Sequence, residues 1–123
     1  MVQEHNRFKL FSAQYASGAG LTSLLREIEK WVAANKVAPK SVGVEYLEGS
    51  GRLLMSIGYR DDEAYPISLH STSIGKLDGG SDFTKVEQAI AGLASKLKNI
   101  ICHELFVTET GDLNMIFMLK GGA

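Results

Sequence analysis

The stretch that decides the fold is VGVEYLEGSGRLLMSIGYR, residues 42–60. Apolar side chains alternate with small or polar ones on both sides of the turn Glu48-Gly49-Ser50-Gly51. Alternation at every second residue is typical of a strand with one buried face, and glycines supply the positive φ angles that tight hairpins require. The stretch therefore predicts a β-hairpin. The residues predicted to face a helix are Val42, Val44, Tyr46, Leu53, Met55, Ile57 and Tyr59.

A strand and a helix are predicted before this hairpin. Residues 7–16 are aromatic-rich and partly alternating, which indicates a strand. After it, apolar residues recur at spacings of three and four, the pattern of an amphipathic helix. These are Leu21, Leu24, Leu25, Ile28, Trp31 and Val32. Pro39 sets the end of the helix, because proline disfavours helical backbone at the residue before it.

The same order of elements begins again at residue 65. Residues 65–74 predict a strand, and a second hairpin is predicted from 100–108 and 113–120. The helix between them has the apolar stripe Phe83, Val86, Ile90, Leu93 and Leu97, with Ser81 or Asp82 as N-cap. A shift of about 62 residues overlays the two helical stripes, and a shift of 60 overlays the hairpins.

The repeat defines the predicted fold class. We expect a single α+β domain over residues 1–123, built from two tandem β-α-β-β units at about 7–60 and 65–120. Their strands form a mainly antiparallel sheet, joined as one sheet or as two packed sheets, with two helices packed on one face. In the second unit the predicted helix-facing residues are Leu113, Met115, Phe117 and Leu119.

Charge and cysteine content limit the classes of partner and compartment. The net charge of −1 comes from 13 basic and 14 acidic side chains that are scattered along the chain, so neither nucleic acid nor a membrane surface is a predicted partner. No apolar stretch approaches the roughly 20 residues of a membrane span. The polar residues 1–7 and the single cysteine, Cys102, predict a cytoplasmic protein.

Reactive side chains are densest at Cys102-His103-Glu104. Neighbouring residues on a strand point to opposite faces, so the thiol and the imidazole there do not form a nucleophile–base pair. His5 and His70 lie at no metal-ligand spacing to this group. We therefore predict no catalytic residue and no metal site, and the sequence identifies no cofactor. His70 itself fits either a polar pocket or an exposed strand position.

Several residues that alternate with the helix-facing ones in the predicted strands are large and apolar. In a monomer the following large apolar side chains would face solvent: Phe11, Tyr15, Leu47, Leu54, Ile116 and Met118. Apolar side chains that gather on one sheet face indicate an interface or a ligand site. A sheet that curls or splits, so that both faces lie inside one molecule, is the structural alternative.

The predicted function follows from that face. We expect a non-enzymatic interaction or assembly protein that forms a homo-oligomer through the open sheet face. The alternative is a small-molecule-binding protein for an apolar or aromatic ligand, with its pocket at the face or between the two repeat units. The residues predicted for an interface or ligand site are Phe11, Tyr15, Leu54, His70, Ile116 and Met118.

Overall fold

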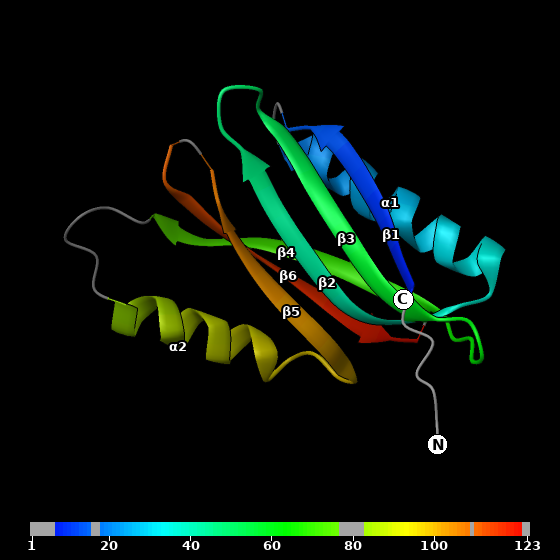
Figure 1. Cartoon of the computed structure of the whole chain (residues 1–123). Coiled ribbons are helices and arrows are strands. Elements are labelled where there is room, and N and C mark those ends of the chain that lie inside the picture. The colour runs from blue at the N-terminus through cyan, green and yellow to red at the C-terminus, as the bar shows by residue number, and fades with distance from the viewer. Residues whose placement is uncertain (1–6, 16–17, 77–82, 109, 122–123) are drawn as a thin grey trace, which may run out of the picture.

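The computed structural model describes residues 7–15, 18–76, 83–108 and 110–121. Figure 1 shows the order of elements that the repeat predicts. They are β1 (Arg7–Gln14), α1 (Gly18–Asn35), β2 (Ala38–Leu47), β3 (Arg52–Arg60), β4 (Ile67–Lys76), α2 (Phe83–Ala94), β5 (Ile100–Val107) and β6 (Asp112–Lys120). The α+β class is confirmed, while the predicted N-cap at Ser81 or Asp82 lies outside the described residues.

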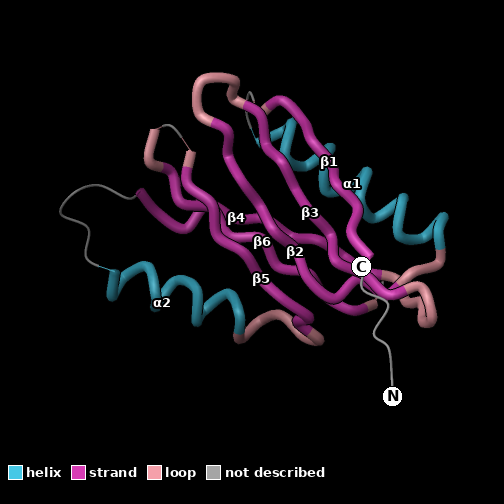
Figure 2. The backbone as a smooth tube through the Cα atoms, viewed as in Figure 1, coloured by secondary structure: helices cyan, strands magenta, loops and turns pink. Residues whose placement is uncertain are grey.

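The strands form two three-stranded antiparallel sheets, the second of the two arrangements that the sequence allows. The first has the order β1-β3-β2 and the second the order β4-β6-β5, so the last strand of each unit is central (Figure 2). In the first sheet Met55 pairs with Phe11 and Val44; in the second Met115 pairs with Thr72 and Leu105. The edge strands β2 and β5 lie side by side and run in the same direction (Figure 1).

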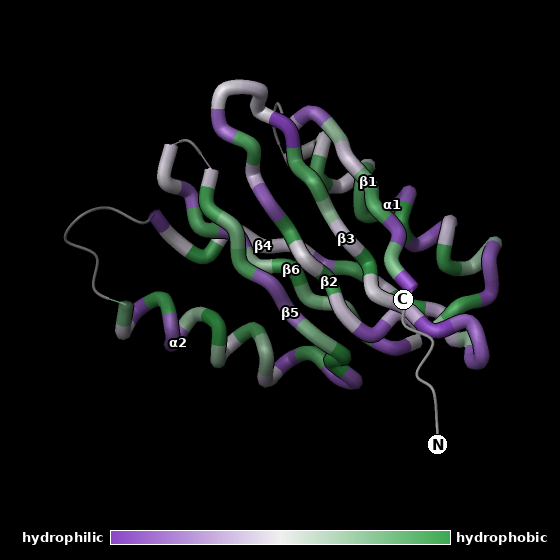
Figure 3. Tube along the Cα trace, in the orientation of Figure 1, coloured by the Kyte–Doolittle hydropathy of each residue, from purple (hydrophilic) through white to green (hydrophobic). Residues whose placement is uncertain are grey.

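The core lies around α1. Leu24, Leu25 and Ile28 are at most 1% exposed and belong to one cluster with residues from both sheets. Hydrophobic and hydrophilic residues alternate along both helices in Figure 3, as an amphipathic pattern requires. The helix-facing set predicted for the first unit is confirmed, since Val42, Leu53, Met55 and Ile57 are buried and Val44, Tyr46 and Tyr59 pack against the cluster.

Side chains of α1 also complete the outer edge of β4. Glu29 Oε2 accepts a hydrogen bond from the Leu69 N–H at 2.7 Å, and Arg26 Nη2 donates to the Leu69 carbonyl at 2.6 Å. An ion pair of 2.9 Å joins Arg26 and Glu29. Backbone groups at a sheet edge need partners or water. The pair on α1 therefore takes the place of a neighbouring strand at this position.

The second helix lies on the other side of the second sheet. Val86 Cγ2 is 3.7 Å from the position that a Cβ on Gly75 would occupy, and Gly75 pairs with Leu113. Leu113 therefore lies on the face of β6 that is turned toward α2. Ile116 and Met118 lie on the opposite face, in the core around α1. The sequence predicted both helices on one face. Residues 113–118 of β6, the central strand of this sheet, are buried without interruption.

Candidate interaction surface

The structure separates the residues predicted for an interface or pocket. Phe11, Ile116 and Met118 are 8%, 0% and 0% exposed, so the prediction that they face solvent in a monomer is wrong. Phe11, on the first sheet, packs against Trp31 of α1, and the second sheet turns Ile116 and Met118 toward the same core. The alternative of a split sheet, with both faces inside one molecule, therefore holds for the second unit.

The remaining predicted residues lie in three different places. Tyr15 is half-buried, and its ring makes edge contacts with Tyr46 and Phe106 at centroid distances of 6.0 and 6.1 Å. Leu54 is half-buried on the outer face of the first sheet, the face turned away from α1. His70 is exposed on β4, opposite Phe117. These side chains do not form one site.

The structure instead exposes two apolar side chains next to each other on β1. Phe8 is 69% and Leu10 is 62% exposed, the highest values among the large hydrophobic residues of the described chain. Both belong to the outer face of the first sheet, where they pair with Gly58 and Ser56. A Cβ on Gly58 would meet Ser41 Oγ and would lie 3.2 Å from Phe8 Cε1, so a larger residue there would crowd both side chains.

Among the residues that the structure describes, the backbone edge of β1 is open as well. Tyr15 N–H donates to the Gly51 carbonyl at 2.8 Å, so the odd-numbered residues of β1 bond to β3. The N–H and C=O groups of Phe8, Leu10 and Ser12 therefore point away from the sheet. Within the described residues β1 pairs with β3 alone. We call this outer edge, with the side chains of Phe8, Leu10 and Ser12, the β1 surface.

Sequence reasoning placed Phe8 and Leu10 in a strand but assigned the open face to the wrong alternation. Residues Phe11 and Tyr15 have the opposite phase, and they are the ones that face α1. Lys9 shares the phase of Phe11, so charge does not mark that phase as the inner one, and lysine near a buried face is typical of an edge strand. An edge strand exposes part of both faces, so hydrophobicity alone does not identify its inner side.

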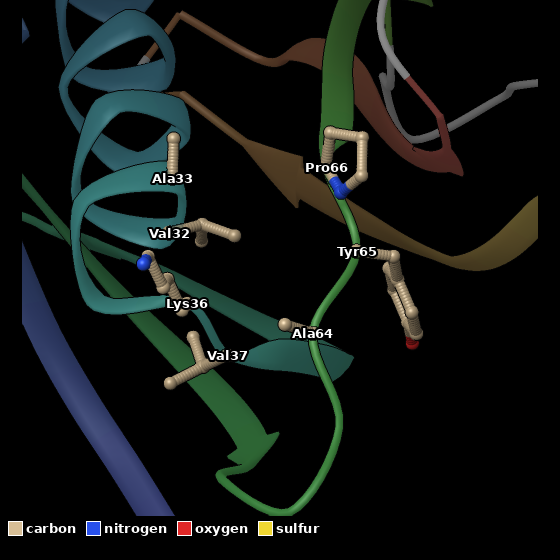
Figure 4. A pocket seen from close by; sticks show the side chains of 7 residues that line it. All are labelled: Val32, Ala33, Lys36, Val37, Ala64, Tyr65 and Pro66. Atoms are coloured by element: carbon tan, nitrogen blue, oxygen red, sulfur yellow. The ribbon is translucent and has the colours of Figure 1, made fainter.

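A pocket between the two units is the second candidate. It has a volume of about 280 Å³ between the last turn of α1 and residues 64–66 (Figure 4). Its lining is mainly apolar and consists of Val32, Ala33, Lys36, Val37, Ala64, Tyr65 and Pro66. The Tyr65 hydroxyl donates to the Pro39 carbonyl at 2.6 Å, which ties the segment to β2. We call this site the interunit pocket.

Lysine side chains surround the ring of Tyr65. The ammonium groups of Lys40 and Lys120 lie 5.1 and 4.6 Å from the ring centroid, within the range of cation–π contacts. Lys40 also pairs with Glu63 at 2.9 Å. The hydrogen bond between them raises the pKa of Lys40 and lowers the pKa of Glu63. These contacts hold Tyr65 beside the pocket.

The thiol of the single cysteine is poorly suited to nucleophilic chemistry. Burial raises the pKa of Cys102 to about 11, against a smaller lowering by a hydrogen bond from the Val42 backbone. Its sulfur lies 3.9 Å from Met118 Sδ. His103 pairs with Phe117 on the opposite face of β6, so the sequence neighbours are separated as expected.

Other site classes find no support in the described residues. Nowhere in the ranges given above do three or more His, Cys, Asp or Glu side chains gather to hold a metal ion. Neither described helix has the length and apolar character needed to cross a membrane. Comparison with protein-family models, with curated proteins and with solved structures finds no match.

Proposed function

We propose that this chain is a non-enzymatic interaction or assembly protein that self-associates through the β1 surface. One observation carries the proposal: the two most exposed large hydrophobic side chains, Phe8 and Leu10, lie together on a strand whose outer edge has no partner strand in the described residues. Scattered exposed hydrophobic residues need no explanation, whereas apolar side chains beside a free edge mark a surface that pairs with another chain.

The other edge strands support this choice of surface. The edge of β4 receives hydrogen bonds from Arg26 and Glu29. The edges of β2 and β5 lie beside each other, and the Val42 backbone bonds to Cys102 there. Among the described edge strands, β1 is the one for which neither a helix nor another strand takes this role.

Sedimentation velocity over about 1–500 µM protein tests the proposal, because an interface of limited area gives micromolar or weaker affinity. We expect a concentration-dependent shift from monomer to dimer or a higher oligomer. The double substitution Phe8→Ser and Leu10→Ser should abolish the shift. Leu47→Ser, on the same sheet face but on β2 and 41% exposed, is the matched control and should leave it unchanged. A monomer at every concentration would contradict the proposal.

The interunit pocket favours a second candidate function, the binding of a small apolar or aromatic ligand. The pocket lies between α1 of the first unit and the segment that leads into β4 of the second. Its volume of about 280 Å³ is near the lower end of the range for ligand sites. A ligand of a few carbon atoms or a single aromatic ring fits this size.

A thermal-shift screen of small aliphatic and aromatic compounds tests the second candidate. Ala33 lines the pocket on the exposed side of α1, so Ala33→Phe should fill it and abolish any shift. Ala34 is its exposed neighbour and does not line the pocket, so Ala34→Phe is the control. A ligand whose shift survives Ala33→Phe binds elsewhere and would exclude the pocket.

A further inference from the structure

From the β1 surface we infer the geometry of self-association: two copies pair β1 with β1 in antiparallel orientation, with the two-fold axis at Leu10. The inference rests on the proposed function, because it assigns the partner and the register of the same surface. It joins the first sheet of one copy to that of the other as one continuous sheet.

The outer edge of β1 is complementary to the same edge of a second copy of the chain. In an antiparallel pair the residues opposite each other exchange N–H···O bonds, so a strand edge is complementary to itself across a two-fold axis. The outward N–H and C=O groups belong to Phe8, Leu10, Ser12 and Gln14. Those of Phe8, Leu10 and Ser12 find partners in the same three residues of the second copy when the axis passes through Leu10.

The length of β1 suits a reversible dimer. Its 8 residues span about 27 Å. A strip of this length, with about 10 Å of side-chain height on each face, covers on the order of 500 Å² per partner. The total of about 1,000 Å² lies at the boundary between weak complexes and specific stable interfaces. The contact is therefore sufficient for association at micromolar or higher concentration.

Repulsion between like charges disfavours two of the possible registers. An axis at Lys9 would place this ammonium directly opposite the partner subunit's Lys9, in a pair whose side chains approach closely. An axis at Phe8 would place Arg7 opposite the partner subunit's Lys9. Like charges directly opposite each other destabilise a strand pair. Both registers are therefore disfavoured, although an axis at Lys9 would match Phe8 with the partner subunit's Leu10.

Apolar contact decides between the axes at Phe11 and at Leu10. An axis at Phe11 places Leu10 opposite Ser12 of the partner subunit and Phe8 opposite Gln14 of the partner subunit, which separates the apolar side chains. An axis at Leu10 places the two leucines opposite each other. Phe8 then lies diagonal to the partner subunit's Leu10, within reach of an aromatic side chain. Lys9 faces the partner subunit's Phe11, so no like charges meet.

Disulfide trapping tests the register. Leu10→Cys, Lys9→Cys and Ser12→Cys are each made in the full chain with Cys102→Ala and are oxidised under mild conditions. In the inferred register the two Cα atoms at position 10 are about 5.5 Å apart, within the range a disulfide spans. The Cα atoms at position 9 are about 7–8 Å apart, and those at position 12 are farther. We expect Leu10→Cys to form covalent dimer at least several-fold more than either control.

A mixed experiment keeps Leu10 in place. Phe8→Cys and Ser12→Cys chains should cross-link to each other when mixed, since these positions are opposite across the axis, and neither should cross-link to itself. The chain could dimerise in sedimentation and yet be trapped most strongly at position 9, or at no position on β1. Either result would contradict the inferred geometry but not self-association. A protein that stays monomeric overturns both.

Discussion

The substitution Leu10→Lys tests the β1 surface at a single position. Leu10 is 62% exposed on the outer face of the first sheet, and its neighbours there are the small residue Ser56 and the ring of Phe8. In the proposed dimer it contacts its own counterpart. The substitution therefore removes two apolar side chains from each interface and introduces two positive charges that face each other.

The size of the effect follows from the exposed fraction. Full burial of a leucine side chain contributes about 1.5–3 kcal/mol. Because Leu10 is 62% exposed, each copy has about 1–2 kcal/mol to contribute, and a symmetric dimer loses about 2–4 kcal/mol. Since about 1.4 kcal/mol corresponds to a tenfold change in affinity, Kd should rise about 30-fold to several hundred-fold. Repulsion between the two lysines increases this value further.

Sedimentation velocity of the variant and of the unmodified chain measures this change directly. The monomer fold should persist, because substitution of an exposed residue typically changes the free energy of unfolding by less than about 0.5 kcal/mol. Urea unfolding monitored by Trp31 fluorescence checks that point. Leu47→Lys is the control for added charge on the same face, and its Kd should match that of the unmodified chain. Equal loss of association in both variants would refute pairing through β1 and favour packing of whole sheet faces.

Three further predictions concern the monomer. Glu29→Ala leaves the Leu69 N–H without its acceptor and should lower the free energy of unfolding by about 1–3 kcal/mol in urea titration, whereas Glu27→Ala, on the exposed side of α1, should change it little. Met118→Glu places a carboxylate in the fully buried core and should prevent stable folding. The control Met118→Leu should lower the free energy of unfolding by less than about 1.5 kcal/mol. A folded Met118→Glu chain would contradict the core assignment. The rate at which a disulfide reagent labels Cys102 should rise with pH up to about pH 11, because burial raises the pKa of this thiol. The labelling rate of an unperturbed thiol levels off above about pH 8.5. A plateau near that pH would contradict the burial of Cys102.

Local pattern was sufficient for the elements but not for the faces of two strands. The hairpin at residues 42–60 could be predicted because its alternation and its glycines depend on a few neighbouring residues. The inner side of β1 depends instead on contacts with distant residues. Phe11 faces inward, where its ring packs against that of Trp31 with the ring centroids 5.8 Å apart. Nothing within residues 7–14 distinguishes Phe11 from Phe8.

The sequence of β6 contains a pattern that distinguishes a covered strand from an open one. Residues 113–119 are apolar at every position except Asn114. Such a run is typical of a strand covered on both faces, whereas a strand with one open face alternates. The structure buries Ile116 and Met118 against the core around α1 and Met115 and Phe117 on the side of α2. The apolar residues that suggested an open face were therefore the sign of a covered one.

Within the described residues the two units protect their first strands unequally, and this difference explains why β1 has no partner on its outer edge there. Helix α1 covers the first sheet and also reaches β4, where Glu29 and Arg26 bond to the strand edge. For equal protection, α2 would have to reach β1 in the same way. It packs near Gly75 of β4 instead, with no buried residue of its own among the described positions. One helix thus protects an edge in the other unit without a reciprocal contact. The edge left open carries Phe8 and Leu10, so a second copy of β1 can supply the missing partner.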